Sequence, residues 1–259
     1  MTIKFGPAGL GPVKDAVENL EEFHRLGLKA CEIAFTYGVY IKKEEDMKMI
    51  KDASKRLGIR LSIHAPYWIN LNSKDEEKVR KSKERILSCC EVGSKLGVEV
   101  VVFHSGFYGG MDEEESYCNI RDRVKEMLEV IKEKGWKIKL APETMGKVNV
   151  FGSIEQIARL VKDTGCSFCL DFAHILAREK KVDYSRVIEL FGGYDNWHVH
   201  FSGIEYGEKG ERRHILTEHS EWEKLLGKLP KDKEIVIINE SPSMVEDAVV
   251  GLKVNKKLM

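Results

Sequence analysis

The chain has 259 residues and a balanced charge, with 42 Lys and Arg residues against 42 Asp and Glu residues. This length permits one large α/β barrel or two smaller domains, and a formal charge of zero excludes a global attraction to nucleic acid, so a polyanion would need a local site. No basic stretch opens the chain and no apolar run approaches the ~20 residues of a membrane span, so we expect a cytoplasmic protein.

Three stretches repeat one pattern, in which a basic helix end and a leucine precede a glycine and an apolar strand. They are RLGLKACEIAF from Arg25, RLGIRLSIHAP from Arg56 and KLGVEVVVFHSG from Lys95. The glycine fits a left-handed helix C-cap. Extending the pattern predicts strands near 3–8, 30–35, 60–65, 99–105, 137–143, 167–173, 197–202 and 234–240. It also predicts helices near 12–26, 43–57, 75–96, 112–134, 153–163, 183–191, 219–228 and 243–253.

Eight strand–helix units in about 250 residues predict an α/β fold of the (β/α)₈ type, a TIM barrel, as a single domain over residues 1–259. An open doubly wound sheet is the alternative, but no GxGxxG motif follows the first predicted strand. The cysteines are scattered, and Cys166 and Cys169 fall in one strand on opposite faces, which predicts buried apolar side chains and no shared metal.

Histidines and acids collect where the predicted strands end, which is where such barrels carry their chemistry. They are His64, His104, Glu143, Asp171, His174, His200 and Glu240, with His214 in the loop after the seventh strand. One such histidine is more often structural, but buried carboxylates are unfavourable by several kcal/mol unless a cation or donor meets them. Imidazole and carboxylate without thiolate suit Zn²⁺, with Mn²⁺ or another divalent ion as the alternative. The set predicts two to three ions.

Strand alternation supports most of these positions. In the fifth strand, strict alternation would point Lys137 and Lys139 into the barrel together with Glu143. This predicts a bulge at Pro142, which would let Glu143 point inward while the two lysines point outward. His198 lies two residues below a predicted ligand on the same face, so we expect it to be a polar core group that supports the site.

Six motifs, SIHAPYWINL, FHSG, APET, CLDFAH, VHFSG and INES, carry a resemblance to the endonuclease IV family of apurinic/apyrimidinic endonucleases. The resemblance covers nearly the whole chain, and that family lies among barrels similar to xylose isomerase. It implies zinc ions held in turn by His64, His104 and Glu143; by Glu143, Asp171, His200 and Glu240; and by His174 and His214. Glu143 would be the bridging and catalytic carboxylate. A metal-activated hydroxide would cleave duplex DNA 5′ to an abasic site in base-excision repair, without a nucleotide cofactor or membrane, and the protein would act as a monomer.

The chain departs from the family at the third ion. The family places an Asp two residues before the loop histidine, where this chain has Arg212. Glu211 is one residue further back and would reach only with a change of register. Arg212 and Arg213 are predicted to contact DNA phosphate, or else to form a solvated pair. The loop after the second strand lacks the arginine-bearing stretch that penetrates DNA, and Tyr37 is among its nearest substitutes.

Tyr67 and Trp68 follow a predicted ligand and correspond to residues that wedge into the duplex where a base is missing. In the alternative, Tyr67 packs over the helix that follows. Asn70 is predicted to contact a backbone phosphate. The runner-up function is a sugar or sugar-phosphate isomerase or epimerase, which needs one metal ion and the tetrad Glu143, Asp171, His200 and Glu240, but neither His104 nor His214.

Overall fold

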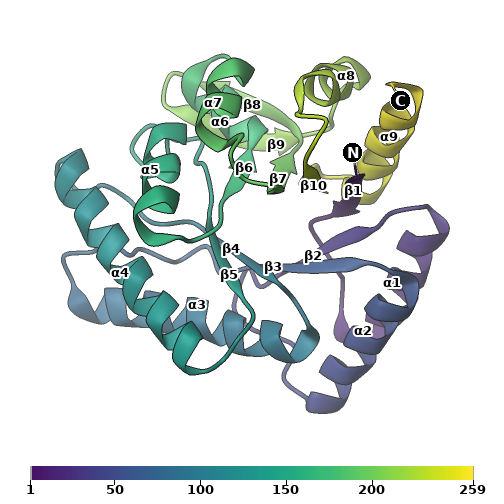
Figure 1. The fold of residues 1–259 in the computed structure, drawn as a ribbon, viewed down its shortest axis with the longest axis horizontal. Coiled ribbons are helices and arrows are strands. Elements are labelled where there is room, and N and C mark those ends of the chain that lie inside the picture. The colour runs from purple at the N-terminus through teal and green to yellow at the C-terminus, as the bar shows by residue number, and fades with distance from the viewer. Residues whose placement is uncertain (1, 259) are drawn as a thin grey trace.

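Eight parallel strands close into a barrel, and helices cover its outside (Figure 1). This computed structural model describes residues 2–258, so the first and last residues of the predicted domain lie outside the described part. The barrel strands are β1 (Thr2–Pro7), β2 (Ala30–Ala34), β3 (Arg60–His64), β4 (Val100–Phe103), β5 (Lys139–Pro142), β6 (Cys169–Asp171), β7 (Asn196–Phe201) and β10 (Glu234–Asn239). The predicted (β/α)₈ fold class is confirmed.

Hydrogen bonds join the strands into two four-stranded sheets, in the orders β1-β10-β7-β6 and β2-β3-β4-β5. Two seams then close the barrel. Between β5 and β6, the Thr144 amide donates to the Cys169 carbonyl at 3.0 Å. Between β1 and β2, the Lys29 amide donates to the Phe5 carbonyl, also at 3.0 Å. The strands therefore form a closed ring, which excludes the open doubly wound sheet.

The seam between β1 and β2 depends on a glycine. A Cβ atom built on Gly6 would lie 1.9 Å from the carbonyl oxygen of Ala30, far inside van der Waals contact. Only a residue without a side chain permits this approach of two backbones. The first strand consequently places no side chain at this point of the seam.

The helices follow their strands in the expected order and pack their apolar faces on the outside of the barrel. They are α1 (Ala16–Arg25), α2 (Glu44–Leu57), α3 (Glu76–Leu96), α4 (Glu113–Glu133), α5 (Ile154–Thr164), α6 (Phe172–Glu179), α7 (Tyr184–Phe191), α8 (His219–Lys228) and α9 (Met244–Leu258), with a short 3₁₀ turn at Val13–Asp15. The glycines of the repeated pattern have positive φ, at 84° for Gly27, 65° for Gly58 and 76° for Gly97, as predicted for helix ends. Figure 1 shows α9 beside β1, so the last helix packs next to the first strand.

Three elements, the two strands of a hairpin and one helix, were not predicted from the sequence. The loop after β7 folds into an antiparallel hairpin of β8 (Gly203–Gly207) and β9 (Gly210–Ile215). Helix α6 begins directly after β6, where the Asp171 carboxylate accepts a hydrogen bond from the His174 amide at 2.8 Å. This cap starts the helix at once and turns His174 back over the barrel.

The predicted bulge in β5 is wrong. The register from Val100–Lys139 to Phe103–Pro142 runs without a shift. The alternation that aims Glu143 at the barrel interior therefore does extend to Lys139, but Lys139 lies at the opposite opening of the barrel, where its side chain is exposed. A lysine at that end can share a face with Glu143 without a bulge, because its side chain reaches water directly.

The remaining expectations concern the cysteines and the membrane. Cys166 and Cys169 are both buried and belong to different apolar clusters, as predicted, but they do not share a strand, because β6 begins at Cys169 and Cys166 precedes it. Among residues 2–258, no helix combines the length and the apolar character that a membrane crossing requires.

Candidate metal centre

All eight side chains predicted to bind metal converge at the carboxyl ends of the barrel strands. They form three groups that share members, and in each group the possible ligand atoms lie within 4.8 Å of one another. The groups are His64, His104 and Glu143; Glu143, Asp171, His200 and Glu240; and Asp171, His174 and His214. Because Glu143 and Asp171 each belong to two groups, the three groups form one continuous cluster.

In the first group, two imidazoles meet one carboxylate oxygen. The Nε2 atoms of His64 and His104 lie 3.2 Å and 3.0 Å from Oε2 of Glu143. The Nδ1 atom of His64 lies 2.7 Å from the carbonyl oxygen of Ala65, which can only accept a proton. This contact places the proton of a neutral imidazole on Nδ1 and leaves the Nε2 lone pair free for a cation.

The second group takes the other oxygen of the same carboxylate. Nδ1 of His200 lies 3.2 Å from Oε1 of Glu143 and 3.5 Å from Oε1 of Glu240. Asp171 is fully buried, and its Oδ2 atom makes no hydrogen bond among the described residues, although Nδ1 of His174 lies 3.3 Å away. A buried carboxylate oxygen without a hydrogen bond, close to further acids, is costly unless positive charge meets it, so these residues fit a divalent ion.

The third group lies where α6 meets the β8–β9 hairpin. The rings of His174 and His214 are 5.2 Å apart, and Nδ1 of His214 lies 2.6 Å from the Ser202 hydroxyl. Nε2 of His174 lies 3.3 Å from Oε2 of Glu211. Glu211 therefore lies beside the third group, although the sequence alone did not place it within reach.

A β-bulge accounts for the position of this acid. Glu205 pairs with Arg213, and the register of the hairpin then shifts by one residue, which leaves Arg212 as the extra residue of β9. Simple alternation would put Glu211 and His214, three residues apart, on opposite faces. The extra residue brings both toward the third group, while the Arg212 side chain stays 66% exposed near Glu205.

The electrostatics of the cluster couple acids to histidines. Burial opposes ionisation of Glu143, but His200 and His104 outweigh it and hold the pKa of this carboxyl well below its ordinary value. Burial likewise opposes ionisation of Glu240, but His200 lowers its pKa to about 2. Burial raises the pKa of Asp171 to about 6. The charged acids therefore depend on positive charge close by, which bound cations would also supply.

A cavity of about 420 Å³ opens above the cluster. Besides cluster residues, its lining includes Tyr67, Ile69, Phe107, Met145, Lys147 and Val150. The loop 145–150 is held from behind by Arg178, whose Nη1 donates to the carbonyls of Lys147 at 2.7 Å and Val150 at 3.0 Å. One wall is therefore largely apolar and fixed in place, while the floor is the acid–histidine cluster.

Exposed aromatic rings follow β2 and β3, and one of them, Tyr67, lines this cavity. Tyr67 is 50% exposed and stacks on His104, with ring centroids 5.3 Å apart and planes at 14°. It therefore packs over the first metal group and not over α3. Trp68 is 53% exposed and lies 5.6 Å from the ring of Tyr37, which is 84% exposed. Three aromatic side chains from two loops are thus presented to solvent beside the cluster.

The other residues predicted to bind DNA lie on the same rim. Oδ1 of Asn70 accepts hydrogen bonds from the amides of Asn72, at 3.1 Å, and Phe107, at 3.3 Å, and so ties two loops together. Nε of Arg213 lies 2.7 Å from Oε2 of Glu205. DNA contact by Asn70 and by the two arginines of β9 stays a prediction.

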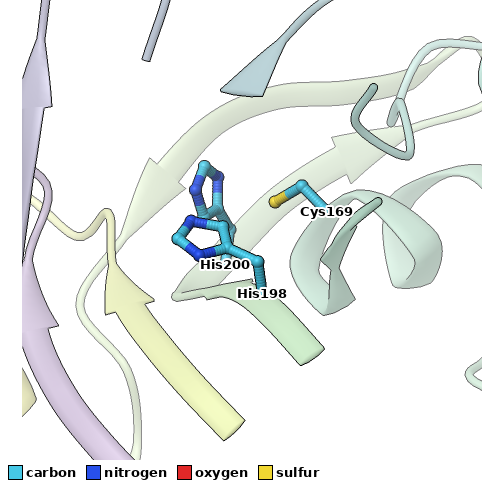
Figure 2. A group of neighbouring side chains, drawn as sticks. All are labelled: Cys169, His198 and His200. Atoms are coloured by element: carbon cyan, nitrogen blue, oxygen red, sulfur yellow. The ribbon is translucent and has the colours of Figure 1, made fainter. Parts of the chain in front are cut away.

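One buried acid beneath the cluster was missed. Glu32, in β2, is fully buried and faces Ser62, His198 and His200. His198 thus occupies the polar core position expected of it. Figure 2 shows the rings of His198 and His200 and the sulfur of Cys169 directed toward one another. The alternation of β2 would have revealed Glu32, since it is the inward-facing acid of an otherwise apolar strand.

A (β/α)₈ barrel with a rim of histidines and acids suited to divalent metal ions is the class that fold and site define. Within this class, residues 20–256 match the xylose isomerase-like TIM barrel family, and the chain belongs to that family. The superfamily expected from the sequence motifs is thereby confirmed.

The chain is similar both to an uncharacterized protein and to proteins named as endonucleases. An uncharacterized protein of Methanocaldococcus jannaschii is 34% identical over 270 residues, which cover 98% of this chain and 97% of that protein. A probable endonuclease 4 of Carboxydothermus hydrogenoformans is 31% identical over 122 residues, which cover 45% of this chain and 42% of that relative.

Solved structures share the fold at low identity. Endonuclease IV from Thermus thermophilus has a TM-score of 0.70 at 21% identity and covers 99% of this chain and 98% of its own. SacUVDE has a TM-score of 0.74 at 19% identity, with 100% of this chain and 99% of its own covered. D-Psicose 3-epimerase from Clostridium cellulolyticum has a TM-score of 0.71 at 14% identity, with 99% of each chain covered. Nucleases and epimerases thus share this barrel, and the site must decide between them.

Proposed function

We propose that the protein is an endonuclease IV-like phosphodiesterase that cleaves duplex DNA on the 5′ side of an abasic site. It would use two to three divalent ions, with Zn²⁺ as the preferred ion because its ligands are imidazoles and carboxylates. The family includes endonuclease relatives, and the exposed aromatic rings beside the cluster suit a damaged duplex.

The three linked ligand groups are the observation that carries this proposal. A single-ion isomerase needs only the second group, whereas this rim adds His64 and His104 on one side and His174 and His214 on the other. Several ions within one small cluster suit the displacement at a phosphodiester, because they stabilise both the attacking and the leaving oxygen.

The residues would divide the work as follows. Bound ions would supply positive charge to the phosphate and an activated water. Glu143 presents one carboxylate oxygen to the first group and the other to the second, so it would hold two ions side by side. Tyr67 and Trp68 would fill the stacking gap left by the missing base, and Tyr37 would extend this surface.

The apolar wall of the cavity would receive the extruded sugar. Its hydrophobic residues, Phe107, Met145 and Val150, face a pocket with an acidic floor, so the deoxyribose would lie between them while its phosphate meets the ions. Arg212 and Arg213, exposed on the hairpin, would reach the phosphates that flank the site.

A sugar or sugar-phosphate epimerase is the second candidate, and one observation favours it. The tetrad Glu143, Asp171, His200 and Glu240 is complete, with ligand atoms within 4.8 Å, and it would hold a single ion beside two acids able to move protons. Under this reading the four histidines outside the tetrad would have no part in the reaction; they are His64, His104, His174 and His214.

A cleavage assay separates the two functions. Metal-loaded protein is incubated with a duplex that carries one tetrahydrofuran abasic analogue, and with the undamaged duplex as the control. We expect a single cut that leaves a 3′-hydroxyl. The absence of cleavage, together with turnover of a ketose, would replace the nuclease by the epimerase. Elemental analysis should find two to three zinc ions per chain, and one manganese or magnesium ion would contradict the proposal.

A further inference from the structure

We propose that Glu32 is a positioning residue: it fixes which nitrogen of His200 carries the proton and so directs the other nitrogen at the metal centre. This role rests on the proposed binding of an ion by His200. Glu32 falls within the first repeated stretch, RLGLKACEIAF, but the family motifs do not include it, and it lies in the middle of β2, below the carboxyl end of the strand.

The two nitrogens of His200 face opposite surroundings. Nδ1 lies 3.2 Å from Glu143 and 3.5 Å from Glu240, inside the second ligand group. Nε2 lies 2.9 Å from Oε1 of Glu32, the usual length of an N–H···O hydrogen bond. Nε2 and this oxygen face each other across this distance, and neither makes a hydrogen bond within residues 2–258. The carboxylate would attract the ring proton to Nε2 and so leave the Nδ1 lone pair directed at the cation site.

The second oxygen of Glu32 is anchored separately. Oε2 accepts a hydrogen bond from the Ser62 hydroxyl at 2.8 Å and lies 2.9 Å from Nε2 of His198. The carboxylate is fully buried, so water cannot replace these partners. Ser62 and His198 therefore hold Oε2 in place, and Oε1 stays directed at His200.

The cluster has a competing interpretation that the same geometry argues against. Cys169, His198 and His200 present donor atoms within 4.8 Å, and Figure 2 shows the thiol directed toward both rings, as in a deeper metal site. An ion there would take one nitrogen of His200 in addition to the one facing the rim. Nε2 faces the Glu32 carboxylate at 2.9 Å, which favours a proton on this nitrogen over a further ion.

The substitution Glu32→Gln tests this role with almost no change in shape. Because Ser62 and His198 both donate toward the Oε2 position, the amide oxygen would settle there. The amide NH₂ would then face Nε2 of His200, which would have to accept a hydrogen bond. The proton of His200 would move to Nδ1 and block the lone pair that the ion needs.

Two measurements follow from this exchange. Burial lowers the pKa of His200, but Cys169 and the surrounding acids raise it well above its ordinary value, so the spectra must be recorded at a pH where the ring is neutral. At that pH, long-range ¹H–¹⁵N spectra of the metal-free protein should show the Nε2–H form of His200 in the wild type and the Nδ1–H form in Glu32→Gln. Competition with a chromophoric chelator should show the affinity of the second group for Zn²⁺ falling about 10- to 100-fold, as for other partners of metal-bound histidines. Ser62→Ala is the matched control, since it disturbs the same layer but keeps the Glu32 carboxylate and should retain the Nε2–H form.

Several results would overturn the proposal. An Nδ1–H form in the wild type would do so, even if Glu32→Gln failed to fold. Unchanged tautomer and affinity in a folded Glu32→Gln would do so as well, and so would the loss of one ion from Cys169→Ala. All these measurements are made without DNA. A wild type that does not cleave abasic DNA would therefore refute the proposed function and leave the role of Glu32 standing.

Discussion

Replacement of Glu211 by alanine tests the third metal group, because this acid reaches the group only through the bulge in β9. Its Oε2 atom lies 3.3 Å from Nε2 of His174, and the side chain is 16% exposed, so solvent screens it little. A charge-assisted contact of this kind is worth about 1.5–3 kcal/mol. Its loss should weaken binding of the third ion roughly 10- to 150-fold and leave the ions of the other two groups in place.

Stepwise titration of the metal-free protein with Zn²⁺, followed by calorimetry, would resolve the weakened step. Arg212→Ala is the neighbouring control, since this side chain points to Glu205 and should not change the affinity. Deletion of Arg212 is the sharper control: it removes the extra residue and brings Glu211 two residues before His214, on the same face without a bulge. This deletion should retain the third ion. If it loses that ion while Glu211→Ala keeps it, the assignment of Glu211 is wrong.

Three further predictions concern the rest of the site. Glu143→Gln removes the carboxylate shared by two groups, so DNA cleavage should fall by more than about 100-fold, because loss of a residue that only hydrogen-bonds to a metal ligand already costs about 10- to 100-fold. Elemental analysis should find fewer bound ions, and full activity would contradict the shared role of this carboxylate. Tyr67→Ala combined with Trp68→Ala should weaken binding of abasic duplex, measured by fluorescence anisotropy, by about 1–3 kcal/mol per lost stacking contact, while the metal content stays constant. Unchanged binding would refute the proposal that these two rings fill the gap left by the missing base. Gly146→Ala brings a Cβ within 2.7 Å of the acid of the third group, so the last Zn²⁺ step of a titration should weaken, whereas Gly227→Ala, which has nothing within 4 Å, should match the wild type.

The rim of the barrel was predictable because its position follows from local signals. A glycine that ends a helix and an apolar run that ends in His64 or His104 define both a strand and the end of that strand. Parallel strands in a closed barrel bring such ends to one rim, so the ligands meet although they lie far apart in the sequence. The positions of these ligands could therefore be predicted without predicting the conformations of the loops.

Features that depend on contacts between distant segments were not predictable in this way. Nothing in the run ERRH predicts the β-bulge next to Glu211. The bulge is fixed by a distant segment, because the Glu211 amide donates a hydrogen bond to the Gly146 carbonyl, in the loop 145–150, at 3.2 Å. The expected bulge at Pro142 failed for the opposite reason. Alternation was applied as if every inward residue were enclosed, whereas Lys139 lies at the open end of the barrel.

The bulge in β9 also bears on how homologous chains are compared. The register shift leaves Arg212 as an extra residue of β9, so Glu211 lies beside His174 although it stands three residues, and not two, before His214. A column-by-column comparison puts Arg212 where the acid belongs and scores the ligand as lost. Among barrels of this family, the presence of a third ion should therefore be judged from where the carboxylate lies around His174, not from the residue two places before the loop histidine.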